Sequence, residues 1–567
     1  MSNDSQFRSL GRFLYTQNPF YLISCFLILY GLLVTAQAND DLFTRSIFLT
    51  SSIAAYTLLM AVTSVAVVRL GKVWEDARSI FLVVIISQVA MSTAMDELCN
   101  LDWKQAGIIL SVAGGFAAMI TELVLRYCRI QLPSWYRGAF YTLLLIFFAI
   151  PVVMGHAVAE RNNTLTSWGA PMFSLCIGTA LLLLAPALRK RNSLVADNGT
   201  PWKWPLYPLS AFVILIVLAA IRSHAIWMSF GFIGESARFE PFLLLPIALA
   251  IFILVVEADW NTKAVNQEID QVRRPPHVLT YAAMATAPTM LLCGLTRRGM
   301  TFLPIRETLA HYGGSALTLS MLAVLIFYGY AWIRRIPHAA YAVVLTLLAM
   351  SFWGDLPLSA KSLGLQHWMI AATASLFCLC SCLQKLKSEE RWVAFAASTC
   401  TTIVLAGQAF GEPENGLVFS SIFGLIAALG IGASFDSALA NVLRNVSAAL
   451  ITVGAAALVV WHFARSPGMA ASMALIAIAV GALVYMRIVR RWWWLWVSAA
   501  HATGFAVIAA AGGYQSGVFN GDSWPIQSGL LCFAIGITIT SFKTGACQRM
   551  FKSTEPSRRL AGYQRGF

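Results

Sequence analysis

The chain has 567 residues, of which 58% are apolar and only 12% are charged, and its mean hydropathy is +0.70. A soluble globular chain carries roughly 25% charged residues. The composition therefore excludes an ordinary soluble enzyme, a long disordered protein and a collagen-like repeat, and it indicates a polytopic membrane protein.

Apolar runs of about 17–25 residues can cross the hydrocarbon of a bilayer as α-helices. The chain contains eighteen such runs, which predicts an all-α transmembrane helix bundle over residues 19–542. The connecting segments average about eleven residues, whereas a soluble domain needs about 50, so we expect no soluble domain. The runs centre near Leu27, Tyr56, Ser87, Gly115, Phe148, Thr179, Leu215, Leu249, Thr286, Ala323, Thr346, Ala374, Cys400, Leu425, Ala455, Ile478, Thr503 and Ile535.

Two of these runs are weaker than the others. The run near Thr286 contains Pro288 and several threonines, and the run near Thr346 is short. Sixteen spans is therefore the alternative count.

The basic residues of the short connecting segments predict the orientation. If the N-terminus lies inside, the inner segments carry thirty of the 40 Lys and Arg residues and the outer loops carry ten. We therefore predict that residues 1–18 and 543–567 are cytoplasmic tails. The expected location of the protein is the cell (inner or plasma) membrane. Basic residues spread over ten short segments form no continuous track for nucleic acid. Anionic lipid headgroups at the cytoplasmic face are the expected partners.

The first run has features of a signal peptide. Arg8 and Arg12 precede it, and Ala36-Gln37-Ala38 follows it as an A-x-A cleavage pattern. The apolar stretch of about 18 residues is longer than the usual 7–15 of a signal peptide. We therefore expect a retained first helix, with cleavage of residues 1–38 as the alternative.

Two pairs of acids follow spans on the predicted outer side, Asp40-Asp41 and Asp96-Glu97. Paired carboxylates at a membrane surface can hold a divalent cation or act as a general base. Asp40-Asp41 is similar to the acidic pair in the first outer loop of the GT-C class of lipid-linked glycosyltransferases. That resemblance implies a catalytic role for Asp40 and Asp41. It covers only these two residues, in a shorter loop and without the soluble outer domain common in the class.

Polar side chains near the middle of spans are candidates for a substrate path. His501 lies within about one turn of the centre of its span, where it can relay protons, bind an anionic group or hydrogen-bond a neighbouring helix. Ser398, Thr401 and Thr402 share one helix face, and Gln88 lies mid-span in the third run. Such hydroxyl and amide groups either line a polar path or join helices.

Charged residues are scarce within the spans. Glu122, Arg126 and Glu257 are expected at inner helix ends, where their side chains can reach the headgroups, and Glu122 and Arg126 have the i, i+4 spacing of an ion pair. No nucleotide-binding or metalloprotease motif occurs. The cysteines of the C-x-C-x-C sequence at Cys378, Cys380 and Cys382 are too few for a thiolate site of four ligands. We predict no cofactor and no metal.

Three functions remain open from the sequence. The first is a transporter or permease for a small or amphipathic solute, indicated by the number of spans, by prolines that kink helices and by mid-span hydroxyls. The second is a non-catalytic assembly subunit with a membrane-protein partner, indicated by the scarcity of buried charge. The third is a membrane transferase for a lipid-linked substrate, which depends on Asp40-Asp41.

Overall fold

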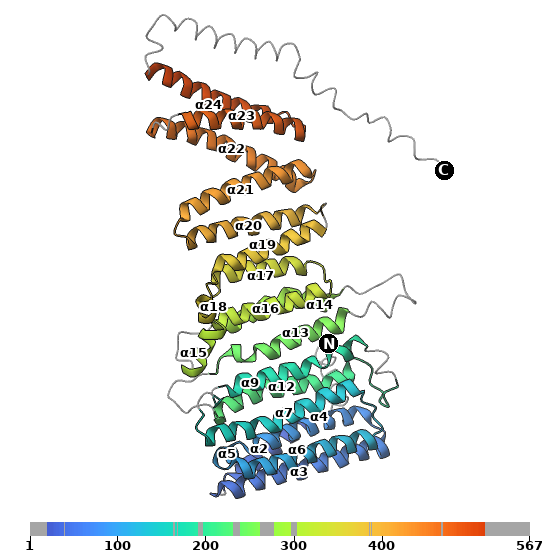
Figure 1. Ribbon diagram of the computed structural model, residues 1–567. Helices are drawn as coiled ribbons and strands as arrows, with labels where there is room; N and C mark the ends of the chain where they lie inside the picture. The colour runs from blue at the N-terminus through green and yellow to red at the C-terminus, as the bar shows by residue number, and fades with distance from the viewer. Residues whose placement is uncertain are drawn as a thin grey trace, which may run out of the picture. The chain divides into compact units, whose positions relative to one another are not determined.

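The computed structural model describes residues 20–38, 40–162, 165–166, 168–190, 197–230, 239–260, 277–295, 303–384, 386, 388–465 and 469–515. These residues are predominantly helical and include no strand, which confirms the all-α class (Figure 1). The tails predicted at 1–18 and 543–567 lie outside them. The chain divides into two compact units, unit 1 (Met1–Ala374) and unit 2 (Ser375–Phe567), and each is described by itself.

Unit 1 begins with a group of long helices joined by short turns (Figure 1). The π-helix η1 (Val67–Gly71) extends α3, and the short helices α5 (Asp96–Leu101) and α10 (Ala185–Arg189) follow α4 and α9. The long helices are α2 (Phe20–Ala36), α3 (Leu42–Ala66), α4 (Trp74–Thr93), α6 (Trp103–Tyr127), α7 (Ser134–Ala159), α9 (Gly169–Leu182) and α12 (Leu206–Phe230).

The second half of unit 1 continues this packing, because α13 contacts both α9 and α16. The helix near Thr286 changes to a 3-10 helix at Ala287, directly before Pro288, which cannot donate a backbone hydrogen bond. The elements are η2 (Pro241–Leu244), α13 (Leu245–Trp260), α14 (Val278–Thr286), η4 (Ala287–Gly294), α15 (Leu303–Tyr312), α16 (Ala316–Ile333), α17 (Ala339–Trp353) and α18 (Leu358–Ser362).

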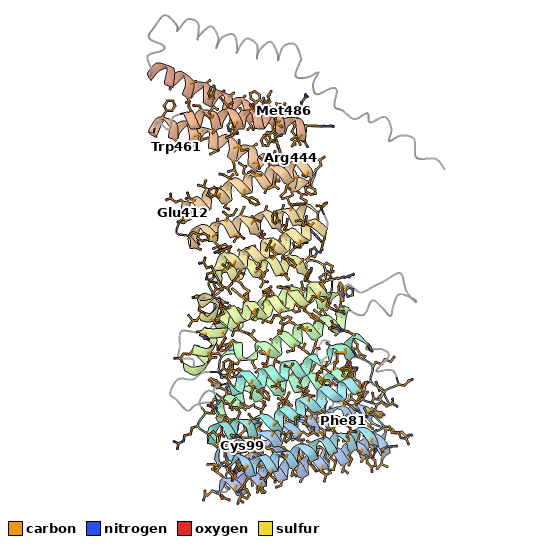
Figure 2. All side chains as sticks on the ribbon, viewed as in Figure 1. Phe81, Cys99, Glu412, Arg444, Trp461 and Met486 are labelled. Carbon is orange, nitrogen blue, oxygen red and sulfur yellow. The ribbon has the colours of Figure 1, made fainter. Side chains whose placement is uncertain are left out.

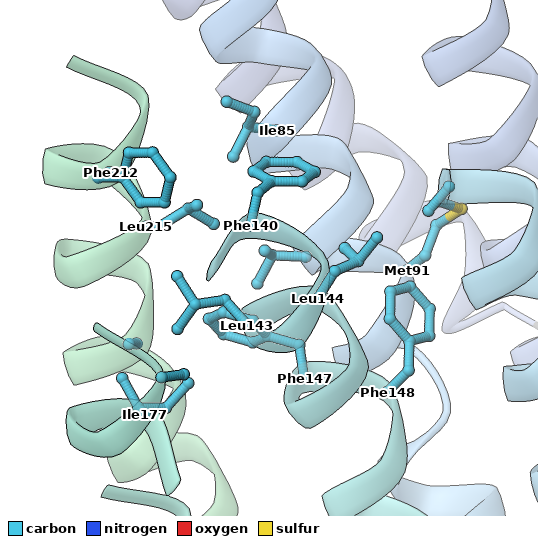
Figure 3. Close-up of a cluster of buried hydrophobic side chains, with 14 of the residues drawn as sticks. Ile85, Met91, Phe140, Leu143, Leu144, Phe147, Phe148, Ile177, Phe212 and Leu215 are labelled. Atoms are coloured by element: carbon cyan, nitrogen blue, oxygen red, sulfur yellow. The ribbon is translucent and has the colours of Figure 1, made fainter. Parts of the chain in front are cut away.

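The core of the first group lies where α4, α7, α9 and α12 meet (Figure 3). Four buried residues of α7 follow the i, i+3, i+4, i+7 pattern of one helix face: Phe140, Leu143, Leu144 and Phe147. On the same helix, 66% of Leu145 is exposed. Because lipid tails are as apolar as these side chains, close packing rather than removal from water holds such helices together.

The described part of unit 2 contains most of α19 (His367–Gln384) and five further helices. The turn between α20 and α21 brings Gly407 and Gly416 together, and a Cβ on Gly407 would lie 2.6 Å from the Gly416 Cα. Helices α22 and α23 both pack against α24. The five helices are α20 (Glu389–Ala409), α21 (Pro413–Ser434), α22 (Ala438–Arg465), α23 (Met469–Val489) and α24 (Trp494–Gln515).

The helices fall where the apolar runs predict them. Seventeen of the eighteen predicted centres lie inside helices, and the last, Ile535, lies outside the described residues. Among the described helices, thirteen are long and apolar enough to cross a bilayer, and four shorter ones are also apolar. The short ones include both weaker runs, near Thr286 and Thr346. Helices of this kind indicate a multi-pass membrane protein, and eighteen spans stays a prediction.

Successive helices reverse direction within each unit. In unit 1, Phe81 and Cys99 lie at opposite ends, and we call the end with Cys99 the α5 end (Figure 2). In unit 2, Glu412 and Trp461 lie at one end and Arg444 and Met486 at the other (Figure 2). The predicted orientation places the α5 end outside the cell.

A close approach between α5 and α7 gives a test of the packing. Gly155 of α7 faces the Cys99 carbonyl, and a Cβ at this position would lie 2.3 Å from that oxygen. We expect Gly155→Ala to cost about 1–3 kcal/mol of stability, because backbone must move. The control is Gly138→Ala in the same helix, where a Cβ meets nothing within 4 Å.

For this control we expect a gain of up to about 1 kcal/mol, because alanine favours helix. The measurement is unfolding in mixed micelles, followed by tryptophan fluorescence. Equal stability of the two variants would contradict the contact between α5 and α7.

Candidate functional site

A cavity of about 500 Å³ opens at the α5 end of unit 1, between α2, α3, α4, α5 and α12. Helix α2 supplies an apolar wall, and the other elements supply polar groups. The apolar wall consists of Phe26, Leu29, Tyr30 and Leu33. The polar groups belong to Arg45, Ser46, Thr93, Asp96, Glu97 and Ser229. The cavity therefore offers the apolar and the polar surface that an amphipathic solute needs.

A buried ion pair lies at this cavity. Asp96 is 5% exposed and Arg222 of α12 is 1% exposed. The guanidinium binds the carboxylate with two nitrogens: Nη2 donates to Oδ1 at 2.7 Å, and Nη1 donates to Oδ2. The Ser229 hydroxyl also donates to Oδ2, at 3.4 Å. Paired donors of this kind form a strong, directional interaction with a carboxylate.

Arg222 lies inside its span rather than in a loop. It precedes the end of α12 by eight residues, which is about 12 Å along a helix. A charge at such a depth is costly and usually marks a functional position. Arg222 was not predicted as a site residue, because the pattern of apolar runs places it in an outer segment. The signal was available, since Arg222 directly follows the apolar run that ends at Ile221.

A second ion pair lies at the same cavity. Arg45 of α3 meets Glu97 of α5 at 3.4 Å, with side-chain exposures of 23% and 56%. With Asp96 and Arg222, the site holds two acids and two bases and has no net formal charge. Balanced charge favours a neutral or zwitterionic solute over an anion or a cation.

The structure separates the two predicted acidic pairs by role. Asp96 and Glu97 line the cavity, and Asp40 and Asp41 are not part of its lining. Asp41 caps α3: its Oδ2 accepts the Thr44 hydroxyl at 2.5 Å and the Thr44 backbone N–H at 3.0 Å. These two hydrogen bonds hold the pKa of Asp41 below its ordinary value, and the bond from the Thr44 hydroxyl has the larger effect. Asp40 is exposed.

The capping role of Asp41 can be tested. We expect Asp41→Ala to lower the melting temperature slightly, and Asp41→Asn, which keeps a cap, to lower it less.

The effect of Asp41→Ala should depend on pH. Because the pKa of Asp41 is lowered in the folded state, the ionised cap stabilises the folded protein at pH values above the ordinary pKa. That contribution is lost as the pH falls through the lowered value, so the deficit of Asp41→Ala should shrink in acid. Melting curves at neutral and acidic pH measure this, with Asp40→Ala as the control. Loss of a transferase activity in Asp41→Asn at unchanged stability would contradict a purely capping role.

Gln88 joins two helices. Its side chain is 1% exposed, and Nε2 donates to the Ala117 carbonyl and to the Thr121 hydroxyl, both at 3.0 Å. Because a carbonyl must receive a donor, these bonds fix the orientation of the amide. Its Oε1 is buried and has no hydrogen-bond partner among the described residues.

The predicted hydroxyl cluster of α20 bonds to its own helix. Ser398, Thr401 and Thr402 each donate to a carbonyl three or four residues earlier, at 3.0, 3.0 and 2.9 Å. This local bonding satisfies the hydroxyl donors without a solute.

His501 is fully buried in unit 2, and its Nδ1 lies 2.8 Å from the Val497 carbonyl of its own helix. The contact between helices comes instead from Ser498, whose hydroxyl donates to the Ala479 carbonyl of α23 at 2.9 Å. His501 and the Ser398 cluster belong to unit 2, and the residues that line the cavity of unit 1 do not include them.

The prediction that the Glu257 side chain reaches the headgroups is wrong, because this side chain does not leave the bundle. It is completely buried near the end of unit 1 opposite α5. Arg189 and Arg334 each place Nε 2.8 Å from one of its oxygens, and the Tyr330 hydroxyl donates to it as well. The ends of α10, α13 and α16 converge there, which the spacing within one helix does not reveal.

Glu122 also differs from its predicted pairing. It meets Arg137 of α7 at 3.8 Å and accepts the Tyr141 hydroxyl at 2.6 Å. The pair therefore joins α6 to α7 rather than following the i, i+4 spacing to Arg126.

No protein family, curated protein or solved structure matches this chain. Within the part of the chain that the structure describes, no group of three or more His, Cys, Asp and Glu side chains is arranged to hold a metal. The geometry of the cavity at the α5 end is therefore the feature that indicates a function.

Proposed function

We propose that this integral membrane protein is a transporter or permease for a small amphipathic solute without net charge. The observation that carries the proposal is the ion pair of Asp96 with Arg222, buried within the helix bundle beside a cavity at the α5 end. A charge pair that served stability alone gives little net benefit, because burying two ions costs about as much as their attraction returns.

The geometry supports a specific binding mode. A zwitterionic group can exchange partners with an ion pair of the site, its cation facing a carboxylate and its anion a guanidinium. The apolar part of the solute then lies along the α2 wall of Phe26 and Tyr30. Because a zwitterion has no net charge, its binding moves no net charge out of water. Rocking of helix groups about such a site would carry the solute across.

Uptake into proteoliposomes tests the proposal with three probes of the same shape. Phenylalanine is a zwitterion, phenethylamine is a cation and 3-phenylpropionate is an anion at neutral pH. We expect the zwitterion to be taken up at least tenfold faster than the two charged probes. Preference for either charged probe, or no uptake of any of them, would contradict the proposal.

A cavity-filling variant locates the site. Ala225 of α12 lines the cavity, and Ala225→Phe should reduce uptake at least tenfold. The matched control is Val217→Phe on the same helix, because half of Val217 is exposed. Equal uptake by the two variants would place the path elsewhere.

One observation favours the assembly subunit as a second candidate. Helix α21 has an open apolar face, which consists of the exposed residues Leu417, Val418, Phe419, Ile422 and Ile426. Purification in mild detergent distinguishes the candidates: a stoichiometric partner protein without uptake would support the subunit, and uptake by the chain alone would support the transporter.

A further inference from the structure

A second cavity, of about 130 Å³, lies toward the end of unit 1 opposite α5, between α4, α6, α7 and α12. Its lining is almost entirely apolar and aromatic, from residues such as Phe81, Leu82, Ile85, Phe140 and Phe212. An apolar cavity of about 150 Å³ stays dry and takes up an apolar ligand. This cavity therefore suits a hydrocarbon group.

A cation lies at one end of the cavity. Arg78 lines it from the first turns of α4, and its side chain is half-buried. Glu75 and Asp76 are close in sequence, yet Arg78 forms neither a hydrogen bond nor an ion pair with any residue that the structure describes. A half-buried guanidinium that pairs with no described residue is a site for an anion.

Two tryptophans lie at the level of this arginine. Trp202 lines the cavity and meets Trp74 edge to face at 5.5 Å and Phe81 at 6.0 Å. Tryptophan is enriched where a membrane protein crosses the headgroup layer. Arg78 therefore lies where lipid phosphates are found.

The cavity extends from this level into the bundle. Gln88, which also lines it, follows Arg78 by ten residues on α4, or about 15 Å along the helix. A narrow apolar space of that length, with a cation at one end that pairs with no described residue, fits the shape of one acyl chain and complements the charge of an anionic headgroup.

We propose that this cavity holds one acyl chain of an anionic phospholipid whose phosphate pairs with Arg78. The lipid is a bound partner of unit 1, and the inference is independent of the transport proposal because it uses the opposite end of the unit. The phosphate supplies a negative charge opposite the Arg78 guanidinium, and the acyl chain fills the space between α4 and α12.

Photo-crosslinking in nanodiscs tests the site. The probe is phosphatidylglycerol with a diazirine near the middle of one acyl chain, and mass spectrometry maps the labelled peptides. We expect labelling of the α4 segment around Phe81 and Ile85 and of α12 around Phe212. Phosphatidylcholine with the same labelled chain should label these peptides at least fivefold less.

Variants and competition separate the headgroup from the chain. Arg78→Gln should reduce labelling by phosphatidylglycerol at least fivefold, whereas Arg126→Gln, which removes an exposed arginine from α6, should leave it unchanged. Leu82→Trp, which fills the cavity, should abolish it. In the wild type, unlabelled phosphatidylglycerol should compete and phosphatidylcholine should not, a readout that does not depend on the folding of a variant.

Three results would overturn the assignment. Equal labelling by phosphatidylcholine would show that the negative charge of the headgroup does not direct binding. Unchanged labelling in Arg78→Gln would remove the role of the arginine. Labelling of the same peptides by diazirine palmitate but not by phosphatidylglycerol would identify a free fatty acid as the occupant.

Discussion

Arg222→Met is expected to destabilise unit 1 by about 3–5 kcal/mol, because it leaves the buried carboxylate of Asp96 without its partner. Methionine keeps the length and most of the apolar stem of arginine, so the loss reflects charge and hydrogen bonding more than volume. The measurement is unfolding in mixed micelles of increasing SDS fraction, followed by tryptophan fluorescence.

Two further variants make this result specific. The double variant Asp96→Asn with Arg222→Met removes both charges and should recover much of the lost stability. Arg45→Met breaks the more exposed pair with Glu97 and should cost about 1 kcal/mol or less. A single Arg222→Met variant as stable as Arg45→Met would show that Asp96 is not desolvated in the native protein.

The ion pair also connects stability to the proposed transport. If the solute exchanges partners with Asp96 and Arg222, the double variant should fold and fail to take up the zwitterionic probe. A double variant that folds and still transports would mean that the pair serves only the structure. The two measurements therefore separate a structural role from a binding role for the same residues.

The positions of the helices could be predicted from the sequence, because a run of apolar residues long enough to cross a bilayer is a local property. The cap at Asp41 is local too, since Thr44 follows three residues later. The buried ion pair was not predicted, because Asp96 and Arg222 are 126 residues apart. Only the packing of α5 against α12 brings them together.

The surroundings of Glu257 show the same limit. Its position near a helix end predicts a side chain that reaches the headgroups. Instead, Arg189 and Arg334, which lie 68 and 77 residues away, converge on it from two other segments. Sequence patterns give the face and depth of one helix, whereas neighbouring helices decide whether a charge at that depth meets lipid, water or a partner.

Glu257→Gln is the second substitution with a large expected effect. The variant keeps the size of the side chain and removes the carboxylate that faces both Arg189 and Arg334. Two guanidiniums would then lie close together around a neutral amide, so we expect a loss of about 3 kcal/mol. We place the loss at the lower end of the range for buried pairs, because the Arg189 side chain is 44% exposed and water can solvate it.

The matched control is Glu122→Gln, which breaks a pair with exposures of 50% and 41% and should cost about 1 kcal/mol or less. Adding Arg334→Gln to Glu257→Gln removes one of the two facing cations and should restore part of the loss. The same unfolding assay measures all three variants. If Glu257→Gln costs no more than Glu122→Gln, the carboxylate is solvated and does not join α10, α13 and α16 in the native protein.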